Sequence, residues 1–299
     1  MQNRRIGLLG YGILLCLAAT HLLAQSSPLS GRGRAVIVVS GNHNTAPAVD
    51  QLKLRVNGAA TKIDSVERLQ GAGNPIEMVV LLETGMISEL GTVRNFFHTL
   101  PANTSVAFAY LTDYRTVLMS QLTSDPAQAQ QAVIPPTNGP SRLTNPYICL
   151  SDLAKHWPSG NRHARRIVVI ATSGIDPILR EYTSDNVRLQ SAVDDAVRAG
   201  IQVNTILWGN DPAGTNMLSK LAEETGGESF GYASNGAVRI GPYLDQVREQ
   251  SLNEYLVTFS APLDKKTNLA VVEIKTNGFH GHILAPRKVV LAPDSLAVK

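Results

Sequence analysis

One stretch of the chain constrains the fold more than any other. The apolar run Met78–Leu82 ends abruptly in an acid, a hydroxyl and a glycine. A continuous apolar run of this length, bounded by turn residues, is typical of a strand buried on both faces of a sheet. A helical pattern follows it, from about residue 88 to 100. In an open α/β sheet, sites lie where such a strand ends and its helix begins. We therefore expect any functional site at residues 83–87.

The chain around this strand alternates between apolar runs and helical patterns of 10–15 residues. This alternation predicts an α/β domain over residues 75–252, with a doubly wound, mostly parallel sheet of Rossmann-like type and helices on both faces. The predicted strands are 76–82, 106–111, 116–122 (the second arm of a hairpin), 166–171, 201–207 and 229–232. The predicted helices are 88–100, a short one from 126, one that begins at 144–146, 186–199, 215–225 and 243–252.

Two small β elements flank this domain. Residues 35–70 contain two β-rich runs joined at Asn57-Gly58, which is a strong hairpin signal. Residues 254–299 contain three more predicted strands, at 255–259, 270–275 and 283–291. The N-terminal element is too small to be stable alone, and pairing between the two flanks is one arrangement that the pattern allows.

The first residues have the composition of a targeting segment. Arg4 and Arg5 precede a largely apolar stretch, and Ala24 is followed by polar residues. This layout predicts a secretory signal peptide over residues 1–24 and a linker over 25–34. An uncleaved anchor is an alternative, because the bulky Leu22 stands three residues before the expected cut. Lipidation of Cys16 is disfavoured by the leucines before it. We expect an exported protein, in the periplasm or on the surface of a bacterium, with no other membrane segment.

The charge and cysteine content of the remaining chain narrow its function. The segment 1–24 carries two arginines and no acid, so 25 basic and 24 acidic side chains remain, for a net charge near +1. This balance, without a basic run interleaved with aromatic residues, gives no reason to expect a nucleic-acid partner. Cys149 is then the single cysteine, which excludes an internal disulfide. Export without disulfides is typical of a bacterial periplasm or outer surface.

Several fragments resemble one protein family when their order is considered. They are 122–126 (Leu-Thr-Ser-Asp-Pro), 168–174 (Val-Val-Ile-Ala-Thr-Ser-Gly), 199–206 (Ala-Gly-Ile-Gln-Val-Asn-Thr-Ile) and 221–227 (Leu-Ala-Glu-Glu-Thr-Gly-Gly). With the predicted elements, they resemble a von Willebrand factor A domain. The β flanks make the chain similar to the exported "VWFA-related" proteins of acidobacteria. The resemblance implies a domain that binds a protein ligand.

The resemblance also implies a position for a metal-ion-dependent adhesion site. In the family, the first strand ends in Asp-x-Ser-x-Ser, a later loop supplies a threonine, and a third strand ends in an aspartate. The corresponding residues in this chain are Glu83, Gly85, Ile87, Thr144 and Ser173. Magnesium prefers near-octahedral oxygen ligands that include a carboxylate. One displaced carboxylate and two neutral hydroxyls are left here, so we predict no metal and no other cofactor, with magnesium as the alternative.

The predicted functional surface is the rim of loops at the carboxyl ends of the strands, at 83–88, 112–115, 136–145, 173–185 and 208–214. Its candidate binding residues are Glu83, Thr84, Gly85, Ile87, Thr144, Asn145, Ser173 and Asp176. We predict a non-catalytic, metal-independent protein-binding module. A purely structural alternative makes Glu83 a solvent-facing or arginine-paired acid and Thr144 a helix N-cap.

Two functional alternatives remain. One is a divalent-cation-dependent adhesin. The other is an envelope hydrolase with Ser173 as nucleophile, although the sequence around Ser173 lacks the preceding glycine of a nucleophile elbow.

Overall fold

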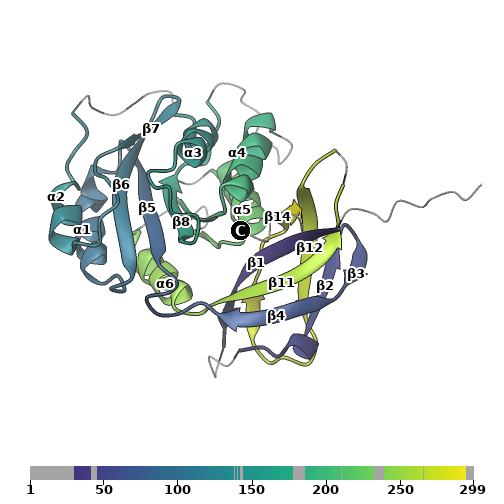
Figure 1. Cartoon of the computed structure of the whole chain (residues 1–299). Helices are drawn as coiled ribbons and strands as arrows, with labels where there is room; N and C mark the ends of the chain where they lie inside the picture. Colours follow the sequence, from purple (N-terminus) through teal and green to yellow (C-terminus); the bar gives the residue numbers. More distant parts are fainter. Residues whose placement is uncertain are drawn as a thin grey trace, which may run out of the picture.

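The structure is a computed structural model, and it describes residues 30–41, 46–137, 139, 141, 144–177, 186–209, 211–231, 239–264 and 266–293. The predicted signal peptide and residues 25–29 of the predicted linker lie outside the described residues. Figure 1 shows an α/β half and a β half side by side, with chain crossings between β4 and β5 and between α6 and β11.

The α/β half is built on a six-stranded mixed sheet. Its strand order is β10-β9-β8-β5-β6-β7, in which β7 pairs antiparallel with β6 and all other neighbours pair parallel. The predicted α/β class and the hairpin of β6 and β7 are therefore confirmed. The strands are β5 (Ile76–Glu83), β6 (Thr104–Thr112), β7 (Arg115–Leu118), β8 (Arg165–Thr172), β9 (Ile201–Leu207) and β10 (Ser229–Phe230).

Strand β5 is buried on both faces, as its unbroken apolar sequence predicts. Met78, Val80 and Leu82 pack into one hydrophobic cluster, whereas Val79 and Leu81 pack into another on the opposite face. Helices α1 (Leu90–His98), α2 (Pro126–Gln131) and α6 (Gly241–Ser251) contribute to the first cluster. Helices α3 (Pro146–Lys155), α4 (Val187–Arg198) and α5 (Pro212–Thr225) contribute to the second. Alternation of side chains along a strand explains why one sequence serves both clusters.

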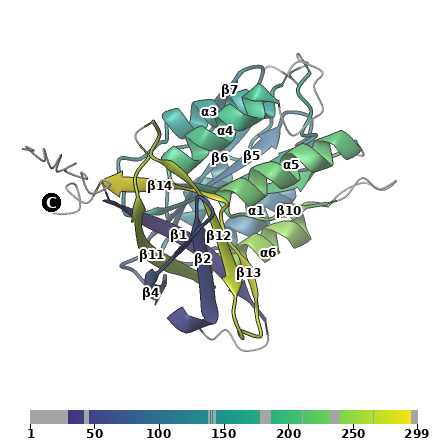
Figure 2. The same ribbon diagram turned by 90° about the vertical axis from the view of Figure 1, so that its right-hand side faces the viewer.

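The two predicted β flanks are not separate elements, because they form one eight-stranded antiparallel sheet with its own core. Its order is β3-β2-β12-β14-β1-β11-β4, and β13 also pairs with β1. Strands from the two ends of the chain thus lie side by side, as Figure 2 shows from the outer side of the β half. The strands are β1 (Ser30–Ser40), β2 (Leu52–Val56), β3 (Ala59–Thr61), β4 (Ile63–Arg68), β11 (Glu254–Pro262), β12 (Leu269–Thr276), β13 (His282–Leu284) and β14 (Lys288–Pro293).

Strand β1 corrects the predicted linker. The strand begins at Ser30, within the stretch 25–34 that the Gly/Ser-rich composition had assigned to a linker. Gly31 and Gly33 are buried, and a Cβ atom on Gly33 would overlap the Phe259 ring. These glycines therefore make room for large side chains of the β-half core. Glycine in a strand often marks such a close approach.

Other boundaries differ from the predictions in smaller ways. The hairpin at Asn57-Gly58 is confirmed, with positive φ values of 49° and 82°. The β-rich run that follows this turn is divided, since β3 pairs with β2 and β4 pairs with β11. The strand predicted at 283–291 is interrupted around Pro286, which lacks the amide donor that a strand needs.

Among the described residues, no helix is both long and apolar enough to cross a membrane.

Ion pairs join the two halves. The guanidinium of Arg165 at the start of β8 bonds to the carboxylate of Glu254 at the start of β11, and both side chains are buried. Lys288 of β14 lies 3.2 Å from Asp194 of α4 and 3.6 Å from Glu224 of α5. Because an unpaired buried charge is costly, the Arg165–Glu254 pair fixes how the two halves meet.

Candidate functional site at the carboxyl end of strand β5

The Glu83 carboxylate links the ends of β5 and β8. Its Oε1 accepts hydrogen bonds from the Ser173 amide at 2.7 Å, from the Ser173 hydroxyl at 3.0 Å and from the Thr172 hydroxyl. Among the described residues, no arginine forms an ion pair with Glu83. Of the structural alternative, the arginine-paired form is not seen in this part of the chain. The half-buried carboxylate instead holds two neighbouring strands together through Oε1.

The residues after Glu83 differ in their surroundings. Thr84 is buried, and its hydroxyl accepts a hydrogen bond from the Ser141 amide at 2.7 Å, which fixes the loop before α3. Gly85 lies beneath the indole of Trp208, and a Cβ atom there would be 3.1 Å from the ring. The serine that the adhesion motif has at this position would therefore press against Trp208. Ile87 follows with its side chain 48% exposed.

Asn145 caps helix α3. Its Oδ1 accepts hydrogen bonds from the amides of Tyr147 at 3.1 Å and Ile148 at 3.0 Å. The prediction of Thr144 as the cap is wrong by one residue, because Pro146 occupies the first helical position, where proline is favoured. Asn145 is fully buried, and its Nδ2 has no hydrogen-bond partner within the described residues. Thr144 itself is half-buried.

Asp176 lies beneath the rim and not on it. Its side chain is fully buried and forms an ion pair with Arg188 at 2.9 Å, near the start of α4. Tyr147 lies close by and donates a hydrogen bond to the Gly174 carbonyl at 2.5 Å. Burial raises the pKa of the Tyr147 phenol, and the Asp176 charge raises it further. This network anchors the β8–α4 connection and leaves Asp176 no access to a partner at the rim.

The described residues at this site do not fit a divalent cation. No group of three or more His, Cys, Asp or Glu side chains in the described part of the chain could hold a metal. The first motif position, Glu83, has one oxygen filled by three donors, and Gly85 and Ile87 offer no ligand atom. At the last motif position, the Ser173 hydroxyl is itself a donor to Glu83. The structure thus brings the first and last motif positions together, but as a hydrogen-bonded pair.

Several exposed apolar side chains lie in loops or at helix ends along the same edge of the sheet. Of seven large apolar side chains that are strongly exposed in the described residues, four lie on or beside the rim. These four are Ile87 after β5, Tyr114 between β6 and β7, Ile134 after α2 and Val187 at the start of α4. Only Ile87 is among the predicted site residues. Tyr114 lies in the predicted loop 112–115. A large aromatic residue in a loop between two predicted strands was the sequence signal that could have identified it as exposed. Residues 138, 140, 142, 143, 178–185 and 210 of the predicted rim lie outside the described residues.

Comparisons with known proteins bear on the fold alone. No protein-family model matches the sequence, and no curated protein matches it. Among solved structures, the chain is similar to the conserved hypothetical protein BatB from Bacteroides thetaiotaomicron, at 13% identity and a TM-score of 0.43, over 59% of this chain and 97% of that one. An aerotolerance-related membrane protein from Bacteroides fragilis matches at 14% identity and a TM-score of 0.42, over 58% and 98% of the two chains.

A third similar structure is described as the VWA domain of SpRpn10. It matches at 14% identity and a TM-score of 0.42, over 57% of this chain and 95% of that one. Because all three scores are below 0.5, these similarities carry no argument about what the protein does. The order of the sequence fragments and the meeting of the first and last motif positions, Glu83 and Ser173, belong to the chain itself. On those grounds the α/β half resembles a von Willebrand factor A domain.

Proposed function

We propose that the chain is an exported, non-catalytic protein-binding module, in which a doubly wound von Willebrand factor A-type domain binds its ligand without a metal. The observation that carries the proposal is the set of exposed apolar side chains on the rim of loops at the carboxyl edge of the sheet, together with a Glu83 carboxylate whose Oε1 already accepts three hydrogen bonds. Ile87, Tyr114 and Val187 are 48%, 46% and 67% exposed.

Two properties of the rim support protein contact. Aromatic side chains such as tyrosine supply much of the binding free energy at protein interfaces, and the buried centres of interfaces are more apolar than the rest of the surface. Beneath them, the bonds of Glu83 to Ser173 and of Thr84 to Ser141 hold the loops in place. A rim fixed in advance loses less conformational entropy on binding. The proposed ligand is therefore a protein with a complementary apolar surface.

The competing cation-dependent adhesin differs in a measurable way. Calorimetric titration of the full chain with magnesium, manganese and calcium separates the two functions. We expect no heat of binding from any of the three ions, because the ligand positions hold one occupied carboxylate and no second acid. Micromolar binding that Glu83→Ala abolishes would overturn the metal-independent proposal.

The competing hydrolase is opposed by the surroundings of Ser173. Its hydroxyl donates to a carboxylate oxygen that accepts two other hydrogen bonds, and no histidine bonds to it in the described part of the chain. A serine nucleophile needs a base free to take its proton. We expect no turnover in a panel of ester, peptide and phosphoester substrates. Turnover that Ser173→Ala abolishes would establish an enzyme.

A crosslinking pull-down from the native envelope tests the binding surface itself. Ile87→Asp places a charge at the centre of the proposed contact, whereas Val271→Asp places the same charge at another exposed apolar position, on β12 of the β half. We expect a crosslinked protein that the wild type and Val271→Asp capture equally and Ile87→Asp loses. Equal capture by all three chains would exclude the rim as the contact surface.

Export is the part of the proposal that rests on composition. It is supported by the order of residue types at the start of the chain, where two arginines precede a largely apolar stretch that ends at Ala24 and is followed by polar residues. Cell fractionation followed by mass spectrometry of the N-terminus tests it. We expect the protein in the envelope or medium, beginning at Gln25, and an intact cytoplasmic chain would contradict export.

A further inference from the structure

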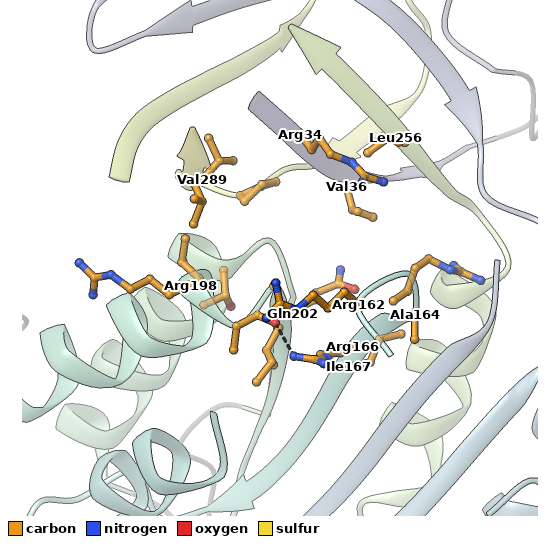
Figure 3. A pocket seen from close by; sticks show the side chains of 18 of the residues that line it. Arg34, Val36, Arg162, Ala164, Arg166, Ile167, Arg198, Gln202, Leu256 and Val289 are labelled. Atoms are coloured by element: carbon orange, nitrogen blue, oxygen red, sulfur yellow. Dashed lines mark hydrogen bonds between the residues drawn. The ribbon is translucent and has the colours of Figure 1, made fainter. Parts of the chain in front are cut away.

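A cavity lies between the two halves, at the amino ends of β8 and β9, and therefore at the opposite edge of the sheet from the rim. Its volume is about 690 Å³. Figure 3 shows that Arg34, Val36 and Leu256 of the β half form one wall, and Arg162, Arg166 and Arg198 of the α/β half the other. A cavity of this volume is in the usual range for small-molecule sites, and junctions between domains are favoured places for them.

The walls of this cavity are strongly basic. Of the residues that line it, seven are arginine or lysine and one, Glu254, is an acid. Three of the cations are already bound: Arg165 to Glu254, Lys288 to Asp194 and Glu224, and Arg166 to backbone carbonyls that include that of Ala199 at 3.1 Å. The other four have exposed side chains and no salt bridge within the described residues. They are Arg32, Arg34, Arg162 and Arg198.

These four guanidinium groups reach the cavity from separate elements. Arg32 and Arg34 alternate along β1, so they share the strand face that points away from the β-half core. Arg162 lies in the loop before β8, and Arg198 lies in the last turn of α4. The charges oppose one another across the cavity. Along the α/β wall, burial lowers the pKa of Arg166, the charge of Glu77 raises it, and the charge of Arg162 lowers it.

The rest of the lining strengthens the effect of this charge. Val36, Leu256, Ile167 and Val289 give the cavity apolar surfaces beside the arginines. Walls of low dielectric constant focus the field of charges of one sign and raise the local concentration of the opposite ion. The full chain has a net charge of only +3, so the positive charge is concentrated here and not spread evenly.

The chemistry of the lining defines a class of ligand. A guanidinium group presents its donors as a planar fork that matches the oxygens of a phosphate or carboxylate group. None of the described lining residues is Phe, Tyr or Trp, so the lining does not have the large aromatic platforms that single-stranded nucleic-acid sites use. We propose that the cavity binds a small multivalent oxyanion, with two or more phosphate or carboxylate groups, between Arg34 on one wall and Arg162 and Arg198 on the other. This site is independent of the rim, which is proposed to bind protein.

Calorimetric titration of the full chain with inorganic pyrophosphate and, separately, with citrate tests the site and distinguishes the two sources of negative charge. We expect at least one of them to bind, with an affinity that falls as sodium chloride is raised, because the contacts are ionic. The double variant Arg34→Gln, Arg162→Gln should bind roughly a hundredfold more weakly, from two charge-assisted contacts of about tenfold each. Binding of only one anion identifies phosphate or carboxylate as the preferred group.

Arg55→Gln is the matched control. Arg55 is an exposed arginine on β2 of the same sheet and does not line the cavity. We expect this variant to bind as the wild type does. The proposal is overturned if neither anion binds to the wild type at millimolar concentration, or if Arg55→Gln loses as much affinity as the double variant. A thermal unfolding scan confirms that each variant is folded. Should the double variant unfold, Arg198→Gln, with an expected loss of about tenfold, replaces it.

Discussion

The carboxylate of Glu83 accepts hydrogen bonds from both the amide and the hydroxyl of Ser173, at 2.7 and 3.0 Å. By the family resemblance, each of these residues stands where an adhesion motif has an aspartate. Two carboxylates held this close repel each other unless a cation offsets their charge. With serine in place of the second acid, the ends of β5 and β8 are joined by hydrogen bonds alone. A serine at position 173 therefore lets Glu83 bond to the neighbouring strand end without a second negative charge beside it.

Glu83→Ala should destabilise the protein whether or not metal ions are present. The variant removes one acceptor that serves three donors, among them the hydroxyl of the buried Thr172. Hydrogen bonds to a charged group contribute about 1.5–3 kcal/mol, so we expect a loss of about 2–3 kcal/mol in the free energy of unfolding. Urea denaturation followed by circular dichroism measures it, with the exposed Glu249→Ala as control. A wild-type midpoint for Glu83→Ala would show that this link does not stabilise the sheet edge.

Restoring the motif serine at position 85 should be unfavourable. A Cβ atom on Gly85 would lie 3.1 Å from the Trp208 ring, and overpacking of this kind costs about 1–3 kcal/mol. We expect Gly85→Ser to lose about 1 kcal/mol and to lose less in a Trp208→Phe background, because the smaller ring leaves room. A double-mutant cycle of unfolding free energies measures this coupling. Additive effects in the cycle would mean that Trp208 does not oppose a side chain at position 85.

Local sequence patterns predicted much of the α/β half. The unbroken apolar run at 76–82 gave β5, and in the β half the turn preference of Asn57-Gly58 gave the β2–β3 hairpin. The end of β5 was also predicted as the place where the motif positions meet, and Glu83 and Ser173 do meet there. These features depend on neighbours in sequence, or on the rule that parallel strands end at a common edge.

Features that depend on distant partners could not be predicted in this way. Gly31 and Gly33 resemble a linker until Leu263 and Phe259, more than two hundred residues away, occupy the space above them. Asp176 resembles a rim acid until Arg188 pairs with it below the surface. The basic cavity is also a long-range product, because Arg34 and Arg162 are far apart in sequence and form no basic run. The small net charge of the whole chain therefore gave no indication that basic side chains collect at one place in the folded protein.

Removal of the Arg165 guanidinium should make the stability depend on pH. Burial raises the pKa of Glu254 above its ordinary 4.5, and Arg165 opposes that rise. In Arg165→Met, the folded state holds the Glu254 proton still more tightly than the unfolded state does. A carboxyl pKa that is raised by folding costs nothing below the unfolded value, and the cost grows as pH rises above it. We expect a loss of about 3–5 kcal/mol near pH 8 and a smaller loss near pH 5.

Denaturant titrations at the two pH values measure this difference. Arg165→Met, Glu254→Leu is the control, because it leaves no buried charge without a partner and should recover stability at pH 8. The same loss for Arg165→Met at both pH values would mean that Glu254 does not titrate in the folded protein.

Gly33→Ala should disrupt the β half, although an exchange of glycine for alanine in a flexible linker would be neutral. Gly33 is buried in β1, and the added methyl group would overlap the Phe259 ring, a fully buried part of the β-half core. Overpacking in a well-packed core costs about 1–3 kcal/mol. Gly160→Ala is the matched control, because nothing lies within 4 Å of its added methyl group. We expect the melting temperature to fall for Gly33→Ala and to stay within about a degree for Gly160→Ala, since surface substitutions change stability by about 0.5 kcal/mol or less. Equal melting temperatures for the two variants would mean that residues 30–34 do not belong to the folded β half.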